Sequence, residues 1–345
     1  MNIAIIFGGI SYEHEISIVS AITLKNILTE SLNLSFIFID KEKELYLIPE
    51  EKMISSYFSE GDYQKATKLG FVKGGFETKS IFSKKMTFEA VLNLVHGGTG
   101  EDGTLASLLD FFEIKYIGPR KEASVSSFNK YFTKIYAESV GVKTLDFEVL
   151  KIGEDRKLKK MTYPVIVKPV TLGSSIGIHI AKNSAEFNYA LDTAFEFDDT
   201  IIIESFKSGV KEYNLAGALT DKFELSIIEE PAKKEFLDFE KKYLDFSREE
   251  RVIKAELPKE IEKKIHENFK KIYGNLFAGS LIRCDFFVIE DEVYLNEINP
   301  IPGSMANYLF NDFEQILLKL ISFLPTNRKI PIEYRYINSL KSAKG

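Results

Sequence analysis

The chain has 345 residues, of which 45% are hydrophobic and 28% charged, a composition typical of a folded protein with two or three modules. Its formal net charge of −6 argues against a nucleic-acid partner, because a phosphate backbone requires a basic surface. The one cysteine, Cys284, excludes an internal disulfide framework, and no segment approaches the ~20 apolar residues of a membrane span, so we expect a cytoplasmic protein without membrane contact.

The chain begins with an apolar strand over residues 2–7, followed by Gly8 and Gly9 and then by a helical stretch that Ser11 is placed to cap. A strand, a glycine turn and a helix in this order are typical of the first unit of an α/β domain. Glu13 lies in the first helical turn, where the helix dipole favours an acid. This explanation of Glu13 requires no ligand.

Residues 41–85 are charged, aromatic and weakly periodic, and we expect them to decorate the N-terminal domain without carrying chemistry. A strand of the buried type follows over residues 88–95 and delivers His96 into the glycine-rich sequence GGTGEDGTL. Ligands of α/β proteins bind at the carboxyl ends of strands, so His96 is a candidate substrate contact. A hydrogen bond within the loop explains His96 equally well.

A boundary between domains is predicted at Pro119, after a last short strand over residues 116–118. A helix is predicted next, over residues 123–140, with Gly141 placed to end it. This helix carries Lys130. Most helical lysines are solvated, and the residues alone indicate nothing more for this one.

Lys168 is a stronger candidate, because it follows four residues of buried strand character in YPVIVKP. A buried ammonium is costly unless an anion satisfies it, and nucleotide phosphate is a natural anion. The loop TLGSSIG comes next, and its backbone N–H groups can line a phosphate, with hydroxyls from Ser174 and Ser175. The loop lacks the lysine of a Walker motif. A glycine-rich turn without a ligand is the alternative.

Two acids follow an apolar run: Glu204 ends the strand in TIIIESF, and Glu212 lies eight residues later. Each acid alone would read as a surface residue, but the spacing favours a paired role. The stretch 236–246, which contains Lys242 and Tyr243, has no helical or strand period and reads either as a functional loop or as a charged surface loop. Helices are predicted over residues 258–273 and 305–324.

The segment 281–303, LIRCDFFVIEDEVYLNEINPIPG, predicts a β-hairpin with an acidic turn centred on Asp291. In that register four polar side chains share one face near one end: Arg283, Asp285, Glu297 and Asn299. The opposite face carries apolar residues that suit a core: Ile282, Cys284, Phe286, Val288 and Ile298.

Oxygen donors beside a guanidinium on a dry sheet suit a Mg²⁺ ion that holds nucleotide phosphates. A solvated acidic face is the alternative. Phe287, Ile289 and Leu295 are expected on the same face as the acids, so that face is not simply polar.

The hairpin sequence RCDFF…YLNEINPIPG resembles the metal-binding segment of the ATP-grasp enzymes. The stretches GG-x-S-x-E, HG-x-x-GEDGTL and KP-x-x-x-GSS-x-G resemble, in order, those of the D-alanine–D-alanine ligases. The resemblance implies α/β and α+β architecture: an N-terminal α/β (pre-ATP-grasp) domain over residues 1–120, a central ATP-grasp subdomain over residues 121–205, and a C-terminal ATP-grasp subdomain over residues 206–345 with an ω-loop and the metal site.

The resemblance also implies roles for residues at matching positions. For catalysis it implies the following residues: Glu13, Ser174, Lys242, Tyr243 and Arg283. For the two D-alanines it implies contacts with these residues: Glu13, His96, Arg283, Gly303, Tyr308 and Leu309. For ATP it implies the following set: Lys130, Lys168, Ser174, Ser175, Glu204, Phe206, Glu212 and Lys242. For two Mg²⁺ ions, with Mn²⁺ as a substitute, it implies these ligands: Asp285, Glu297 and Asn299.

The implied reaction joins two D-alanines through an acylphosphate, for peptidoglycan precursor synthesis, in a homodimer. Two alternatives remain at this point: a ligase with another acceptor, such as D-lactate, and a nucleotide-binding regulatory protein that has lost catalysis. Thr171 and Leu172 occupy positions where the ligases commonly have charged residues, and Tyr308 replaces a common serine. These departures concern loop closure and the second substrate pocket.

Overall fold

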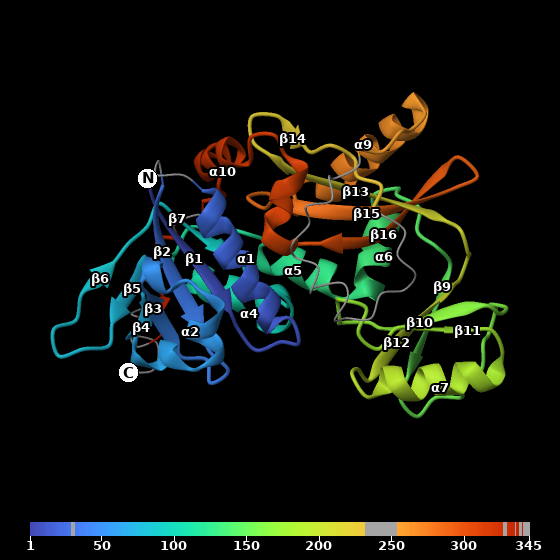
Figure 1. Cartoon of the computed structure of the whole chain (residues 1–345), viewed down its shortest axis with the longest axis horizontal. Coiled ribbons are helices and arrows are strands. Elements are labelled where there is room, and N and C mark those ends of the chain that lie inside the picture. Colours follow the sequence, from blue (N-terminus) through green and yellow to red (C-terminus); the bar gives the residue numbers. More distant parts are fainter. Residues whose placement is uncertain (29–31, 232–253, 327–329, 335, 338–339, 341–345) are drawn as a thin grey trace.

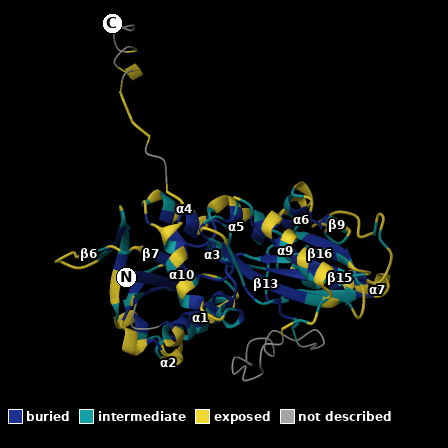
Figure 2. Cartoon of the chain, turned by 90° about the horizontal axis from the view of Figure 1, so that it is seen from above, coloured by how far each residue is buried: buried dark blue, intermediate teal, exposed yellow. Residues whose placement is uncertain are grey.

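The computed structural model describes residues 1–28, 32–231, 254–326, 330–334, 336–337 and 340. These residues form three β-sheets with helices packed against them (Figure 1). Figure 2 shows that the strands are largely buried, whereas the outer faces of the helices are exposed. An α/β part followed by two α+β parts confirms the fold class expected from the sequence. Within the described ranges, no helix is long and apolar enough to cross a membrane.

The first sheet has the order β6-β5-β4-β3-β2-β1-β7-β8. Its parallel half is built from β1 (Asn2–Gly8), β2 (Asn33–Ile39), β7 (Ala90–Asn93) and β8 (Tyr116–Ile117). The almost continuous apolar run of β1 fits a central strand that is covered on both faces. His96 follows the carboxyl end of β7, as predicted for a strand that delivers it into a loop.

The segment 41–85 extends this sheet. It forms an antiparallel meander: β3 (Leu45–Ile48), β4 (Thr67–Val72), β5 (Gly75–Thr78) and β6 (Lys85–Met86). Short helices lie between β3 and β4: η1 (Glu50–Lys52), α2 (Ser55–Ser59) and η2 (Asp62–Lys65). The expected decoration is therefore part of the sheet.

Helix α1 (His14–Ile27) begins later than the sequence predicts, and Ser11 does not cap it. The Ser11 hydroxyl accepts a hydrogen bond from the Glu13 N–H at 3.1 Å and donates one to the His96 carbonyl at 2.6 Å. Ser11 thus links the loop after β1 to the loop after β7. The latter loop continues into α3 (Gly98–Glu101) and α4 (Thr104–Phe111).

The predicted helix over residues 123–140 is two helices, α5 (Lys121–Phe128) and α6 (Lys130–Ser139). Asn129 leaves the helical conformation, with φ −93° and ψ 113°, and its side chain accepts hydrogen bonds from the N–H groups of Tyr131 and Phe132. The prediction of one helix was wrong because Asn129 caps a new helix instead of continuing the old one. Lys130 therefore lies at a helix start.

The second sheet is antiparallel, in the order β11-β10-β12-β9. Its elements are β9 (Phe147–Lys151), β10 (Val165–Pro169), β11 (His179–Ala181), α7 (Ser184–Phe195) and β12 (Thr200–Ser205). Helix α7 packs its buried residues Phe187 and Leu191 into the same core cluster as Val165 and Ile203. Lys168 and Glu204 lie on the neighbouring strands β10 and β12.

The third sheet is also antiparallel, in the order β14-β13-β15-β16. Its strands are β13 (Lys211–Leu219), β14 (Phe223–Leu225), β15 (Ile282–Ile289) and β16 (Glu292–Asn299). Helix α9 (Lys259–Tyr273) confirms the amphipathic helix predicted after Pro258 and buries Ile265 and Phe269 in the core beneath this sheet.

The predicted helix over residues 305–324 is also two elements, the 3₁₀ segment η3 (Gly303–Leu309) and α10 (Phe313–Ser322). Ser304, Met305 and Ala306 have φ of 47°, 56° and 50°, so this turn is left-handed and cannot continue into a right-handed helix. Helix α10 packs Phe313 into the core cluster that contains β1 and α1. Helix α10, near the C-terminus, therefore completes the hydrophobic core around β1 and α1.

Gly217 on β13 lies where a side chain has no room. A Cβ atom there would lie 2.8 Å from Leu225 Cδ2 and 3.0 Å from both Glu224 O and Phe269 Cε1. We expect Gly217→Ala to lower the free energy of unfolding by about 1–3 kcal/mol, because overpacking forces the sheet and α9 apart. Chemical denaturation measures this change.

Gly70→Ala on β4 is the matched control. Its Cβ would meet only the Lys79 Cε atom, at 3.6 Å, so we expect a change within about 0.5 kcal/mol. Equal losses in the two variants would contradict the packing argument.

Candidate active site

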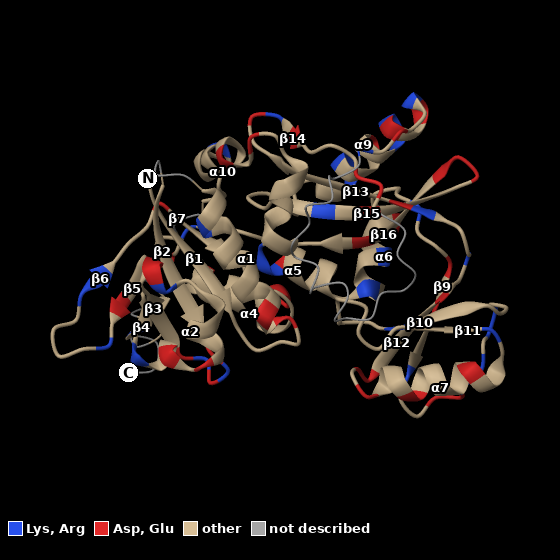
Figure 3. Cartoon of the chain, in the orientation of Figure 1, with Lys and Arg blue, Asp and Glu red and all other residues tan. Residues whose placement is uncertain are grey.

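The candidate residues come from all three sheets and from the loops between them. Figure 3 shows basic positions on α6 and β15 and an acidic position on β16 near the middle of the molecule. The β15–β16 hairpin pairs Arg283 with Asn299 and Asp285 with Glu297, as its polar pattern predicts. The four polar residues expected at the end of the hairpin therefore do lie together.

The rest of the hairpin differs from the prediction. A β-bulge between Asp285 and Phe286 shifts the register, and the turn is the two-residue pair Glu290 and Asp291, with φ of 51° and 62°. Leu295 pairs with Phe286 and is fully buried in the core beneath the sheet. Its expected place on the acidic face was wrong, because the bulge exchanges the two faces beyond the site.

The Arg283 guanidinium forms a bidentate ion pair with the Asp285 carboxylate. Nε donates to Oδ1 at 2.7 Å and Nη2 donates to Oδ2 at 2.9 Å, while Asn299 Nδ2 donates to the same Oδ2 at 3.0 Å. Burial raises the pKa of Asp285, Arg283 opposes that rise, and the neighbouring carboxylate of Glu297 adds to it. The buried carboxyl group of Asp285 and the half-buried one of Glu297 thus lie close together.

This donor set fits a Mg²⁺ ion in its chemistry. Asp285 and Glu297 offer hard carboxylate oxygens, and a cation between them would relieve the repulsion that raises the pKa of Asp285. The described residues contain no group of three His, Cys, Asp or Glu side chains fit for a metal, so the amide oxygen of Asn299, water or phosphate oxygens would complete the donor set. The buried Asn214 Oδ1, opposite Asp285 on β13, also lacks a partner among the described residues.

Lys168 and Glu204 form a buried ion pair, with Nζ 2.6 Å from Oε2. The other oxygen, Oε1, lies 2.7 Å from the ammonium of Lys134, a residue that the sequence analysis missed. Burial alone would raise the pKa of Glu204, but Lys168 and Lys134 together hold it at about 2. Lys134 lies on the buried side of α6, beside Thr133 and Ala137, and nothing in the sequence alone distinguishes it from a solvated helical lysine.

The other expected nucleotide residues lie near this pair. Burial would lower the pKa of Lys168, but Glu204 raises it most strongly, with smaller contributions from Glu297 and Glu212. Glu212 is on β13, opposite Phe287 of β15. The Phe206 N–H donates a hydrogen bond to the Pro164 carbonyl at 3.1 Å, which fixes the backbone directly after β12.

The glycine-serine loop contacts Glu13. The Ser174 hydroxyl donates to Glu13 Oε1, and Ser174 and Ser175 both have left-handed φ, of 57° and 61°. Lys130 Nζ donates to the Leu172 carbonyl of the same loop. A cavity of about 540 Å³ lies here, lined by Ile10, Ser11, Tyr12, Glu13, Gly97, Gly98, Phe128, Thr171, Leu172, Gly173 and Ile176.

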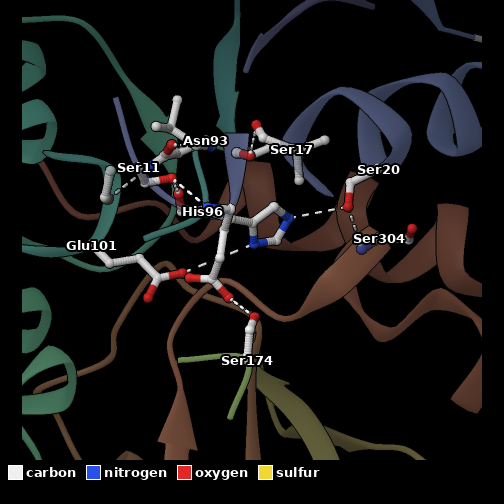
Figure 4. Close-up of polar contacts among 12 residues, drawn as sticks. Ser11, Ser17, Ser20, Asn93, His96, Glu101, Ser174 and Ser304 are labelled. Carbon is white, nitrogen blue, oxygen red and sulfur yellow. Dashed lines mark hydrogen bonds and ion pairs between the residues drawn. The ribbon is translucent and has the colours of Figure 1, made fainter. Parts of the chain in front are cut away.

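His96 is buried in a network of polar contacts (Figure 4). Its Nε2 lies 3.0 Å from the Ser20 hydroxyl, which also accepts a hydrogen bond from the Ser304 N–H at 3.0 Å. Its Nδ1 lies 3.9 Å from Glu101 Oε1. Burial lowers the pKa of His96 to about 4, so the ring is neutral at neutral pH. The network joins α1, the loop after β7 and η3.

Glu101 is a second residue that the sequence analysis did not single out. Burial raises the pKa of Glu101 well above its usual range, and the nearby charge of Glu13 adds to the rise. Its place in GEDGTL, five residues after His96, was the available signal. The Glu101 side chain is only 15% exposed, which is consistent with burial as the main cause of its raised pKa.

The remaining expected residues are placed as follows. Tyr308 is half-buried and close enough to Arg283 to influence its pKa, which Asp285 raises more strongly against the effect of burial. The Leu309 carbonyl accepts a hydrogen bond from the Ile227 N–H at 3.2 Å, and Gly303 is exposed with open space around it. Lys242 and Tyr243 lie outside the described residues.

We predict that the His96 ring stays neutral until the pH falls to about 4, whereas an exposed histidine titrates near about 6.5. The unfolded chain then binds more protons than the folded chain between these two values, so stability falls as the pH is lowered through that window. NMR of histidine-labelled protein, with the signal assigned by a His96→Asn variant, measures the titration. A midpoint near 6.5 would contradict the burial of the ring.

Comparison with known proteins covers both halves of the chain. Residues 2–119 match the family model described as D-ala D-ala ligase N-terminus, and residues 137–315 match the model described as D-ala D-ala ligase C-terminus. The chain is 57% identical to the D-alanine--D-alanine ligase of Sulfurovum sp. (strain NBC37-1), with 100% of this chain and 99% of the relative covered. It is 56% identical to that of Wolinella succinogenes, with 100% of both covered.

A solved structure agrees with these relatives. The crystal structure of D-alanine-D-alanine ligase from Helicobacter pylori has a TM-score of 0.84 and 48% identity, and the match covers 95% of this chain and 100% of that chain. The chain belongs to the D-alanine–D-alanine ligase family.

Proposed function

We infer that this protein is an enzyme that joins two D-alanine molecules to D-alanyl-D-alanine, with conversion of ATP to ADP and phosphate, for the synthesis of peptidoglycan precursors. One feature of the site carries the inference: Glu297 pairs with Asp285 on the hairpin and lies close enough to Lys130 and Lys168 for its charge to raise the pKa of each ammonium against the effect of burial. Lysines suited to phosphate and carboxylates suited to a metal therefore face one space. Such a space suits the transfer of a phosphoryl group.

The nucleotide would lie between the second and third sheets. Lys130 and Lys168 would hold its phosphates, with hydrogen bonds from the loop of Ser174 and Ser175. Glu204 and the carbonyl of Phe206 would accept hydrogen bonds from the adenine amine. Glu212, on the neighbouring β13, would accept those of the ribose hydroxyls.

Asp285, Glu297 and Asn299 would hold two Mg²⁺ ions, or Mn²⁺ in their place. When bound, these ions supply positive charge to the phosphate oxygens. The three residues lie at one end of the hairpin, next to the β-bulge between Asp285 and Phe286.

The reaction then needs two bond-forming steps. A carboxylate oxygen of the first D-alanine takes the γ-phosphoryl group, and ADP leaves. The amine of the second D-alanine, after loss of a proton from its ammonium, attacks the acyl carbon, and phosphate leaves. Arg283 would stabilise the negative charge that develops on the carbonyl oxygen.

Substrate contacts would come from both ends of the chain. Glu13 would bind the ammonium of the first D-alanine within the network of Ser174 and Tyr243, and the neutral His96 would lie near its carboxylate. Lys242 would contact the nucleotide from the same loop as Tyr243. The second D-alanine would be bound by the following residues: Gly303, Tyr308 and Leu309.

A ligase with another acceptor, such as D-lactate, is the closest alternative, and Tyr308 is the position that bears on it. A catalytically inactive nucleotide-binding protein is the other. The presence of Asp285, Glu297 and Lys168 together argues against loss of catalysis. The homodimeric state and the cytoplasmic location are proposed from the family resemblance.

The direct test of the function is phosphate release from ATP with a panel of D- and L-amino acids. We expect release that depends on D-alanine and a dipeptide product by mass spectrometry. L-Alanine is the matched control, because it differs only in chirality. Predominant ester formation in competition between D-alanine and D-lactate near neutral pH would overturn the choice of acceptor.

Glu297→Gln should reduce kcat by roughly 10²-fold or more, because it removes a charge that is used in the transition state. The fold should remain, which circular dichroism verifies. Glu292→Gln on the same strand is the control, since Glu292 pairs at the surface with Lys143 and Lys264. An unchanged kcat of a folded Glu297→Gln protein would contradict the assignment of Glu297 as a metal ligand.

A further inference from the structure

The buried cluster of Lys134, Glu204 and Lys168 contains more positive charge than its carboxylate requires. The two ammonium groups lie 2.7 Å and 2.6 Å from the two oxygens of Glu204. The side chains of Lys134, Glu204 and Lys168 are 3%, 3% and 11% exposed. One positive charge is therefore in excess in a place with little water.

A purely structural ion pair does not need this arrangement. One lysine neutralises one carboxylate, and the burial of a second ammonium adds a desolvation cost that an apolar residue in its place would avoid. Burial lowers the pKa of Lys134, and Glu204 offsets this only in part. The second lysine therefore calls for a further role.

The two lysines face different surroundings. Lys168 is the more exposed, and Glu297 and Glu212 of the proposed active site act on its charge. Lys134 lies behind Glu204, where its Nζ donates to the Leu145 carbonyl at 3.3 Å and lies 5.4 Å from the centre of the Phe147 ring. Lys168 is thus the one placed to turn toward a bound anion, while Lys134 stays with Glu204.

We propose that Lys134 is a positioning residue of the nucleotide site, which keeps the Glu204 carboxylate charged and in place when Lys168 turns from Glu204 to the nucleotide phosphate. The proposal rests on the proposed function only in that ATP binds at Lys168 and Glu204. Without Lys134, this turn would leave a buried carboxylate with no cation.

The same arrangement bears on the choice of base. Once Lys168 has turned away, Glu204 Oε2 is open, and an ionised carboxylate can only accept hydrogen bonds. Adenine presents an amine at its position 6, whereas guanine presents a carbonyl oxygen there. Lys134 therefore supports the preference for ATP over GTP by keeping Glu204 an acceptor.

The test measures binding of ATP and GTP to the full chain by calorimetry, with Mg²⁺ and without D-alanine. We expect Lys134→Met to weaken ATP binding by about tenfold or more, as for a lost charged hydrogen-bond network, and GTP binding by less. Lys134→Arg keeps the charge and should restore most of the preference. Unchanged ATP affinity and preference in folded Lys134→Met, even with a lowered Tm, would show a structural role only and overturn the proposal.

Lys143→Met is the matched control, because Lys143 forms an exposed ion pair with Glu292 at 2.7 Å, and it should leave nucleotide binding unchanged. If Lys134→Met does not fold, Glu204→Gln is compared with the double variant Glu204→Gln/Lys134→Met, which contains no uncompensated carboxylate. Equal ATP affinity of these two is expected, since Lys134 acts through Glu204. A further tenfold loss in the double variant would overturn the proposal. The binding experiment contains no D-alanine and therefore does not depend on the ligase reaction. A protein that binds ATP but does not join D-alanine would overturn the proposed function and still test the role of Lys134.

Discussion

Charge buried away from water is the constraint on which this site depends. Three cations of the site lie against a carboxylate: Arg283 against Asp285, and Lys134 and Lys168 against Glu204. Removal of one partner of a buried ion pair lowers stability far more than replacement of both partners by apolar residues. The role of each of these residues therefore depends on its partner. Around Asp285 and Glu297, burial raises the pKa of Asp285, the charge of Glu297 adds to the rise, and a metal would supply the positive charge that relieves it.

The hairpin shows how far a periodic pattern can be trusted. Alternation of polar and apolar residues paired Arg283 with Asn299 and Asp285 with Glu297, and the structure has these pairs. The pattern centred the turn on Asp291, whereas the turn is the pair Glu290 and Asp291. It also placed Leu295 on the acidic face, which was wrong. A bulge adds one residue to one strand and leaves no mark in the alternation near the site, so the sequence could fix the register at one end only.

The other differences between the predicted and the observed elements also arise from local backbone conformation, which the composition of the sequence does not reveal. The fold class and the family followed from the sequence, because apolar runs indicate the strands and the motifs occur in order along the chain. The break at Asn129 and the left-handed turn at Ser304 to Ala306 did not follow, since each depends on local hydrogen bonds and φ values. Lys134 was missed because a lysine in an amphipathic helix is usually solvated, and only the neighbouring strand β12 reveals its carboxylate partner. The roles of the site residues remain predictions.

The packing of the three sheets explains why polar contacts gather between them. Helix α10 and β1 share one apolar core, whereas the buried core of the second sheet consists only of residues between Leu150 and Ile203. Polar contacts join the second sheet to the rest, among them those of Glu204 with Lys134 and of Ser174 with Glu13, beside ring contacts of Phe147 with Tyr131 and of Phe197 with Tyr12. An apolar interface must expose surface to water when it rearranges, but a polar contact can be exchanged for a contact with a charged ligand at little net cost. A nucleotide site at this junction can therefore bind and release its ligand while both apolar cores stay closed.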